Sequence, residues 1–275
     1  MRRARAPELF WAFVAFAGLC WLATLAGLRV ATGAEEPVPG IPWSRQKSGF
    51  EFQSKSNQER QEDLTVNPGM LWVEQGAALW TKAEGTAAKS CQDCHGAPES
   101  MKGVATRYPA WDPKTGRLNN LETRIQECRS VRQGAAPLAP ESEPLLALTA
   151  LVTHQSLGLP MSPVIDGAAR PAFERGRQLY EERVGQLNLS CAQCHELNWG
   201  RRLRTETISQ GQSNGYPLYR LEWQKLGSLY RRIRSCYFSV RSEPPAHGSD
   251  EHLALELYLA WRAKGLKVEA PAVRR

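Results

Sequence analysis

The hydrophobic pattern separates an apolar run near the N-terminus from a long region in which apolar residues recur at helical spacing. The run covers residues 9–28 and follows three arginines, Arg2, Arg3 and Arg5. A basic start before an apolar stretch is typical of a secretory signal peptide. A run of this length can also span a bilayer, so an uncleaved membrane anchor is the alternative.

The small residues Thr32, Gly33 and Ala34 offer a cleavage site, after which the mature chain would begin at Glu35. We therefore predict a signal peptide over residues 1–34 and a periplasmic protein. Residues 35–68 are polar and contain prolines, so we expect an N-terminal extension there. An exported protein can form disulfides, so a disulfide is an alternative role for each cysteine.

Beyond the extension, one apolar pattern occurs twice. Residues 146–159, "LALTALVTHQSLGL", align with residues 253–266, "LALELYLAWRAKGL". The spacing of the leucines predicts a helix in each segment, and Gly158 or Gly265 would end it. The chain therefore contains an internal repeat, and each of its two units should close with an apolar helix.

The two units also open alike. Residues 74–95, "EQGAALWTKAEGTAAKSCQDCH", align with residues 174–195, "ERGRQLYEERVGQLNLSCAQCH", at an offset of 100 residues without a gap. Trp80 is opposite Tyr180, and the identical pairs are Glu74/Glu174, Gly76/Gly176, Leu79/Leu179, Gly85/Gly185 and Ser90/Ser190. Each opening segment predicts a helix that precedes a cysteine motif.

The cysteines of the mature chain carry the clearest chemistry. They are Cys91, Cys94, Cys128, Cys191, Cys194 and Cys236, and four of them form two C-x-x-C-H motifs that end at His95 and His195. Two thiols one helical turn apart can add to the vinyl groups of haem, and the adjacent histidine can bind its iron. A thioredoxin-like pair would need a βαβ context, and a zinc site would need further ligands. We predict two covalently bound haem c groups.

A glycine-containing helix before the haem motif and an apolar helix at the end of the unit are typical of cytochrome c domains, in which the two helices cross closely. We predict an all-α protein with two cytochrome c-like domains in tandem, at residues 69–158 and 173–275, and long loops. Residues 159–172 are rich in proline and are the predicted linker.

Charge argues against one class of partner. The full chain has a formal charge of +7, and removal of four arginines and one glutamate with the signal peptide lowers it to +4. The remaining arginines are scattered and no nucleic-acid-binding motif accompanies them. We therefore expect no nucleic-acid partner.

The sixth iron ligand is less obvious. Methionine or histidine is the usual choice, but the methionines of the mature chain are Met70, Met101 and Met161, so the second unit has none after its haem motif. Its later histidines are His247 and His252, which we expect at the surface. Cysteine is then the remaining candidate.

The repeat singles out two cysteines. Arg124-Ile-Gln-Glu-Cys128 matches Arg232-Ile-Arg-Ser-Cys236, each between the haem motif and the closing helix. We predict that Cys128 and Cys236 ligate the two haem irons as thiolates, with a Cys128–Cys236 disulfide as the alternative. Arg232 lies one helical turn before Cys236, so it either binds a small anion or is a haem-propionate partner or a solvated surface residue.

The second unit resembles the SoxA family, the dihaem cytochrome subunits of the SoxAX complexes of bacterial thiosulfate oxidation. The resemblance covers the mature chain and is most specific over residues 185–274, including "GQLNLSCAQCHELNWGRRLR" and "LYRRIRSCYFSVRSEPPAHGSDEHLALELYLAWRAKG". Some family members lack the first haem motif, but Cys91, Cys94 and His95 are present in this chain. It is therefore similar to the dihaem form.

The resemblance implies an L-cysteine S-thiosulfotransferase, which joins thiosulfate oxidatively to a cysteine of the carrier protein SoxYZ. It implies that Cys236 is both haem ligand and active-site cysteine, that Arg232 binds the substrate and that Cys128 ligates the first haem. The implied partners are a SoxX-like monohaem cytochrome c subunit and a downstream cytochrome c electron acceptor. The alternatives are a dihaem electron carrier without transferase activity and a dihaem peroxidase.

Overall fold

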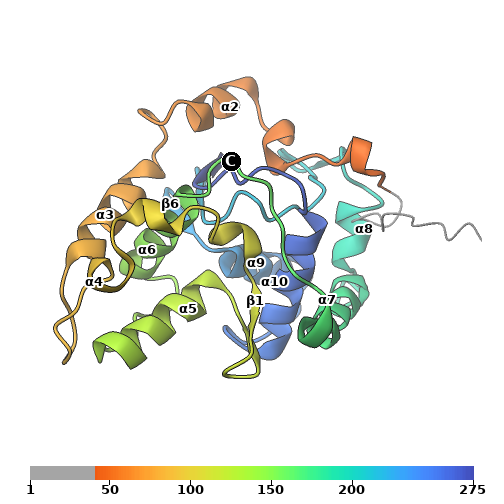
Figure 1. Cartoon of the computed structure of the whole chain (residues 1–275). Coiled ribbons are helices and arrows are strands. Elements are labelled where there is room, and N and C mark those ends of the chain that lie inside the picture. The colour runs from red at the N-terminus through yellow and green to blue at the C-terminus, as the bar shows by residue number, and fades with distance from the viewer. Residues whose placement is uncertain (1–40) are drawn as a thin grey trace, which may run out of the picture. The chain divides into compact units, whose positions relative to one another are not determined.

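The computed structural model describes residues 41–275. The predicted signal peptide at residues 1–34, its anchor alternative and the first residues of the predicted extension lie outside this range. No helix within the described range is both long and apolar enough to cross a membrane. The described chain is mostly helical, as the pattern predicted, with short strands between the helices (Figure 1).

The α-helices are α2 (Lys55–Glu62), α3 (Met70–Thr81), α4 (Gln92–His95), α5 (Leu121–Glu127), α6 (Glu143–His154), α7 (Arg170–Glu181), α8 (Cys191–His195), α9 (Leu229–Ser239) and α10 (Asp250–Arg262). The 3-10 helices are η1 (Trp43–Arg45), η2 (Gly49–Phe52), η3 (Pro98–Met101), η4 (Ala105–Arg107) and η6 (Gly167–Ala169), and η5 (Cys128–Gln133) is a π-helix. The strands are β1 (Ala110–Asp112), β2 (Arg117–Asn119), β3 (Arg202–Leu203), β4 (Glu206–Thr207), β5 (Leu218–Arg220), β6 (Lys225–Gly227) and β7 (Ala272–Arg274).

The predicted opening and closing helices of each repeat form a crossed pair. Helix α3 lies against α6, and α7 lies against α10 (Figure 1). At each crossing a glycine meets a backbone carbonyl: a Cβ added to Gly76 would lie 2.3 Å from the oxygen of Ala147, and one added to Gly176 would lie 2.0 Å from that of Ala254. The close helix crossing that the two glycines predicted is confirmed at both positions.

The strands are an addition to the predicted all-α fold. They pair in small sheets with strand orders β1-β2, β3-β4 and β6-β5-β7, and none is longer than 3 residues among those described. A strand of that length is too short to show an alternating apolar pattern. The helical part of the prediction is therefore confirmed, whereas the strands could not be found from the sequence.

Two of the hairpins link the repeats reciprocally. Leu118 of β2 is 6% exposed and belongs to the apolar cluster around α7 and α10 of the second repeat. Leu226 of β6 is 1% exposed and belongs to the cluster around α3 and α6 of the first. The ring of Tyr219 on β5 lies 5.9 Å from that of Trp72 on α3. Each repeat therefore supplies a hairpin that completes the core of the other.

The π-helix η5 explains a change in the offset between the repeats. Arg124 and Cys128 correspond to Arg232 and Cys236 at an offset of 108 residues, but the closing helices align at an offset of 107. The amides of Ala87 and Leu187 donate to Gln133 and Val240, already at an offset of 107, so the additional residue of the first repeat lies between Cys128 and Gln133, within η5. Single π-helical turns of this kind commonly accommodate one inserted residue and often lie at functional sites.

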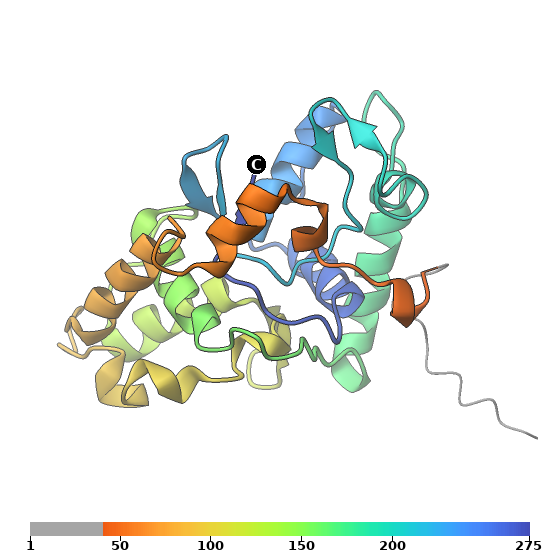
Figure 2. The same cartoon turned by 90° about the horizontal axis from the view of Figure 1, so that it is seen from above.

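The extension lies along the C-terminal strand. The side-chain oxygen of Gln61 accepts a hydrogen bond of 3.0 Å from the amide of Val273 on β7, and the amide of Asn67 donates one of 2.9 Å to the carbonyl of Pro271. Figure 2 shows α2, in orange, crossing the C-terminal segment. Because β7 pairs in parallel with β5, the extension also stabilises the sheet next to α9.

The helix crossings generate the first testable prediction. Gly176→Ala should lower the free energy of unfolding by about 1–3 kcal/mol or more, because the new methyl group would collide with the rigid carbonyl of Ala254. Gly76→Ala should act in the same direction at Ala147. Denaturant unfolding followed by circular dichroism measures both.

Gln75→Ala is the matched control, because Gln75 is exposed on the same helix as Gly76 and a helix favours alanine. It should leave stability within about 0.5 kcal/mol of the parent. Unfolding midpoints for the two glycine variants that equal that of the control would contradict the close-crossing argument.

Candidate functional site

The second C-x-x-C-H motif forms α8, which begins after the cap Ser190, and the first consists of Cys91 and α4, with Ser90 directly before it. The hydroxyl oxygen of Ser190 accepts a hydrogen bond from the amide of Gln193 at 3.3 Å, and the side chain of Gln193 accepts one from the amide of Ser190 at 2.8 Å. Ser90 and Asp93 make the same reciprocal pair, at 3.1 and 2.7 Å. The identical pair Ser90/Ser190 therefore has a structural reason: it starts the helix that orients the two thiols and the histidine.

The second motif fits a haem. The Nδ1 atom of His195 donates to the carbonyl of Ser209 at 2.8 Å, which leaves Nε2 free of a proton and able to bind iron. Burial lowers the pKa of His195 to about 4, so the ring is neutral at physiological pH, as a metal ligand must be. The described cysteines are all free thiols, so the alternative Cys128–Cys236 disulfide is not formed.

The first motif has the same spacing in a more open setting. His95 and Cys94 are exposed, whereas Cys91 is half-buried against the core of the first repeat. The ring of His95 lies 5.8 Å from that of Trp80, whose indole nitrogen donates to the carbonyl of Gly96 at 2.9 Å. Trp80 therefore fixes the end of α4, and these residues also suit a covalently bound haem.

Helix α9 brings Cys236 to the second motif. It begins after Ser228, whose hydroxyl accepts from the amide of Arg231 at 3.1 Å. Burial, and after it the charge of the neighbouring Cys236, raise the pKa of the Cys191 thiol to about 12. The same two causes raise the pKa of Cys194. The structure thus places Cys236 within electrostatic range of both thiols of the second motif.

Cys128 has the equivalent place in the first repeat. Burial raises the pKa of Cys91, with Arg129 acting against it and Cys128 adding to it. Burial also raises the pKa of Cys128, and the smaller causes include the nearby charges of Arg124 and Cys94. Each lone cysteine is therefore a neighbour of one C-x-x-C-H motif.

The two equivalent arginines differ in their partners. Arg124 makes ion pairs of 3.0 Å with Asp112 and 2.6 Å with Glu127. The nearest carboxylate to Arg232 is that of Glu206, at 3.9 Å, and 34% of the Arg232 side chain is exposed. Two carboxylates thus neutralise the positive charge of Arg124 next to Cys128. The charge of Arg232 next to Cys236 is compensated less closely and can attract a bound anion.

The sequence explains this difference once the offset of 108 residues is applied. The positions of Asp112 and Glu127 are occupied in the second repeat by Arg220 and Ser235. Arg220 itself pairs with Glu206, and with Glu222 at 3.0 Å. Glu206 therefore lies between two arginines and compensates only part of the charge of Arg232.

Tyr216 is a site residue that the sequence analysis did not identify. Burial raises the pKa of its phenol, and Arg232 and Cys236 are its strongest electrostatic neighbours. Tyr108 lies next to Arg124 and Cys128 in the same way. Both tyrosines precede a proline at the 108-residue offset, so a repeat search extended to "YP" could have found the pair.

The expectation that His252 lies at the surface is wrong. His252 is 1% exposed, and its Nε2 atom lies 2.9 Å from a carboxylate oxygen of Glu256. The other oxygen of Glu256 accepts from Asn120 of the first repeat at 2.8 Å. The start of α10 is therefore buried between the repeats, which only the tertiary packing could reveal. His247 is half-buried, with its ring 5.5 Å from that of His252.

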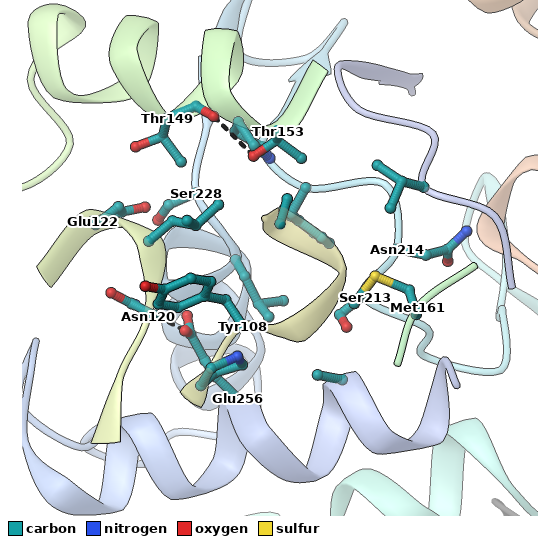
Figure 3. Close-up of a pocket in the computed structure, with 18 residues that line it drawn as sticks. Tyr108, Asn120, Glu122, Thr149, Thr153, Met161, Ser213, Asn214, Ser228 and Glu256 are labelled. Carbon is teal, nitrogen blue, oxygen red and sulfur yellow. Dashed lines mark hydrogen bonds between the residues drawn. The ribbon is translucent and has the colours of Figure 1, made fainter. Parts of the chain in front are cut away.

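A cavity of about 90 Å³ also lies between elements of the two repeats. Tyr108, Tyr216, Glu122 and Glu256 are among its lining residues, and Figure 3 shows polar side chains from both repeats around it. The haem-motif residues and Cys236 do not line it. The cavity is thus a feature of the contact between the repeats and not of the haem motifs.

Comparisons with known proteins agree with this site. A family model described as "SoxA/TsdA, cytochrome c domain" matches residues 75–161. The L-cysteine S-thiosulfotransferase subunit SoxA of Pseudaminobacter salicylatoxidans is 44% identical over 86% of this chain and 83% of its own length. That of Rhodovulum sulfidophilum is 42% identical over 83% of this chain and 80% of its own length.

A solved structure extends the likeness to the whole described fold. The crystal structure of SoxXA from P. pantotrophus matches with a TM-score of 0.81 and 38% sequence identity, over 84% of this chain and 87% of that chain. Identities of this size over most of both chains exceed what a shared fold alone would produce. The chain belongs to the SoxA family, and it contains a cytochrome c domain of the SoxA/TsdA type.

Proposed function

We propose that this protein is the SoxA-like subunit of an L-cysteine S-thiosulfotransferase that joins thiosulfate to a cysteine of a SoxYZ-like carrier protein. One observation carries the proposal to this chain's own residues: Cys236 lies beside a C-x-x-C-H motif together with Arg232, whose carboxylate partner Glu206 lies at 3.9 Å and is shared with Arg220. The names of the relatives support the same activity.

The reaction sets the chemistry that the site must perform. The outer sulfur of thiosulfate and the sulfur of the carrier cysteine form a new S–S bond. The carrier thiol loses its proton, and two electrons leave the sulfur atoms. Because thiosulfate is a dianion and the attacking cysteine is a thiolate, the site must also offset the repulsion between two anions.

Arg232 and Tyr216 are suited to that task. The guanidinium of Arg232 can donate two parallel hydrogen bonds to a sulfonate group, and its charge opposes the repulsion. The phenol of Tyr216 lies next to both Arg232 and Cys236 and can donate a further hydrogen bond. Glu206 and Arg220 would hold Arg232 in place from the side of β4 and β5.

The haem groups would be held by this chain's own thiols and histidines. Cys91, Cys94 and His95 would hold the first, and Cys191, Cys194 and His195 the second, with Cys128 and Cys236 as the respective sixth ligands. When bound, haem c supplies the acceptor for the electrons that leave the sulfur atoms. Cys236 would serve both as ligand and as the active-site sulfur.

The organisation proposed for the chain is two cytochrome c-like domains, at residues 69–158 and 173–275, joined by residues 159–172. The matched pairs α3/α6 and α7/α10 support it. The proposed partners are a SoxX-like monohaem cytochrome c subunit, the SoxYZ-like carrier and a downstream cytochrome c. The match to a SoxXA structure supports the first of these. Export by residues 1–34 would place the complex in the periplasm.

A dihaem electron carrier without transferase activity is the second candidate. It would use Cys128 and Cys236 as inert ligands of equal character. The unequal pairing of Arg124 and Arg232 favours the transferase, because an inert pair would need no available cation at one site only. A peroxidase with a methionine-ligated donor haem is less favoured, since Met161 is buried in an apolar cluster with Ala260.

The haem content is the first test. A pyridine haemochrome assay should find two haems per chain, because both motifs have the same spacing and the same hydrogen bond to the preceding serine. The double substitution Cys191→Ala and Cys194→Ala should leave one. A value of one haem per chain for the unmodified protein would contradict the dihaem proposal.

The two lone cysteines should differ in function. Cys236→Met should retain haem but abolish thiosulfate-dependent reduction in the presence of the partner subunit and carrier, because methionine supplies a ligand without a nucleophilic thiolate. Cys128→Met is the matched control and should keep most of the activity. Stopped-flow absorbance of the haem bands measures both, and full activity in Cys236→Met would rule out a catalytic Cys236.

The two equivalent arginines offer a second matched pair. Arg232→Ala should lower kcat/KM for thiosulfate about a hundredfold, or about 2.7 kcal/mol, since one charge-assisted contact to the reacting anion is lost. Arg124→Ala breaks the ion pairs with Asp112 and Glu127 and should affect stability more than turnover. Equal losses of kcat/KM in the two variants would argue against a substrate-binding role for Arg232.

A further inference from the structure

The imidazole of His195 is held by a loop whose equivalent in the first repeat does not approach His95. We name residues 209–211 the proximal loop. The carbonyl of Ser209 accepts from Nδ1 of His195, and Gly211, with a φ of +73°, lies so close that an added Cβ would be 2.9 Å from the ring carbon Cγ. At the equivalent Gly103, an added Cβ would meet only a methyl carbon of Leu159, at 3.9 Å.

The middle residue of the proximal loop connects it to two other parts of the chain. Gln210 is 0% exposed. Its side chain donates to the carbonyl of Arg45 at 3.0 Å and accepts from the amide of Lys47 at 2.8 Å. Its backbone carbonyl accepts from Nη2 of Arg262 at 2.9 Å. The loop is therefore held by the N-terminal extension on one side and by the end of α10 on the other.

Arg262 is a buried cation beside the second haem motif. Its side chain is 0% exposed, and Nη1 pairs with Glu196, the residue that directly follows His195. Its guanidinium lies over the ring of Tyr180, 4.2 Å from the centroid. The Nε atom of Arg262 is buried without a hydrogen-bond partner. One side chain thus contacts both segments that flank the imidazole, the proximal loop and the end of α8.

The first repeat has no cation at the position of Arg262; its buried arginine near Cys91 is Arg129, on η5, which pairs with Glu84 at 2.6 Å. At the 107-residue offset of the closing helices, Arg262 corresponds to Gln155, which is neutral and donates to the carbonyl of Leu151 at 3.3 Å. Tyr180 corresponds to Trp80. The buried ion pair with Glu196 therefore belongs to the second site alone, and a haem at the first motif provides an internal reference within the same molecule.

A charge that loses its partner in this interior would act on the nearby iron. Truncation of one member of a buried ion pair leaves the other uncompensated. Uncompensated negative charge favours the oxidised state of an iron centre and positive charge favours the reduced state, and the groups that hold a metal-ligating histidine tune the metal through it. The Arg262–Glu196 pair lies where it can affect both the charge near the iron and the groups that hold His195.

We propose that Arg262 is a positioning residue for the second haem, which fixes the proximal loop against His195 and balances the charge of Glu196, and thereby sets the reduction potential of that haem. The proposal rests on the proposed function in one respect, that the motif ending at His195 carries a haem.

The test is a redox titration of the intact dihaem protein, followed by electron paramagnetic resonance. Arg262→Gln should shift the reduction equilibrium of the second haem toward Fe(III) about tenfold, which is about 59 mV for one electron. Glu196→Gln should shift it in the opposite direction, and the double variant should lie near the parent. Arg262→Lys keeps the positive charge and should leave the reduction potential of the second haem close to that of the parent protein. The first haem, whose signal Cys128→Met assigns, should not move.

Arg274→Gln is the control for a merely structural effect. Arg274 is also buried, at 9% exposure, and pairs with Glu269 at 2.7 Å, but it does not contact the haem motif or the proximal loop. Its loss should lower the melting temperature and leave both potentials unchanged. If Arg262→Gln does not accumulate as folded protein, the opposite shift expected for Glu196→Gln decides the matter.

Unchanged potentials in both the Arg262→Gln and Glu196→Gln variants, shifts of the same sign, or equal shifts of both haems would overturn this proposal and leave the proposed function intact. Absence of haem from the second motif in the haemochrome assay would overturn both. The haemochrome assay therefore tests the proposed function, and the redox titration tests the role of Arg262.

Discussion

The structure depends on a contact that occurs once in each repeat, between a glycine of the opening helix and a backbone carbonyl of the closing helix. Gly176 meets the carbonyl of Ala254 so closely that no side chain fits between α7 and α10. Because this crossing fixes the two helices, the end of α10 brings Arg262 over Tyr180 and against Glu196. The core of the repeat is therefore connected directly to the residues around His195.

The reciprocal hairpins make the two repeats one structural unit. Leu118 fills the core of the second repeat and Leu226 that of the first, and these leucines are equivalent at the 108-residue offset. The buried contact between Glu256 and Asn120 adds a polar link. Because the core is shared in this way, the packing of each repeat stabilises the other.

Two sites of the same fold differ here mainly in charge. Arg124 is paired with two carboxylates and Arg232 with none at close range, while the buried cation of Arg262 is replaced by neutral Gln155 in the first repeat. Backbone geometry is conserved between the repeats far better than these side chains. The charge of Arg262 is balanced by Glu196, whereas that of Arg232 is compensated only by Glu206 at 3.9 Å, so the excess positive charge of the second repeat lies next to Cys236.

The sequence by itself determined the haem motifs, the crossing glycines and the equivalence of Cys128 with Cys236, because each depends on residue types at a fixed spacing along the chain. Only the tertiary structure decided which residues face the two equivalent arginines, and therefore that the exchange of Asp112 for Arg220 and of Glu127 for Ser235 changes the pairing of Arg232. Glu206 on β4 contacts both Arg232 on α9 and Arg220 on β5, and His252 is buried because the other repeat covers it. Such neighbours are set by the packing of distant segments, and no local pattern encodes them.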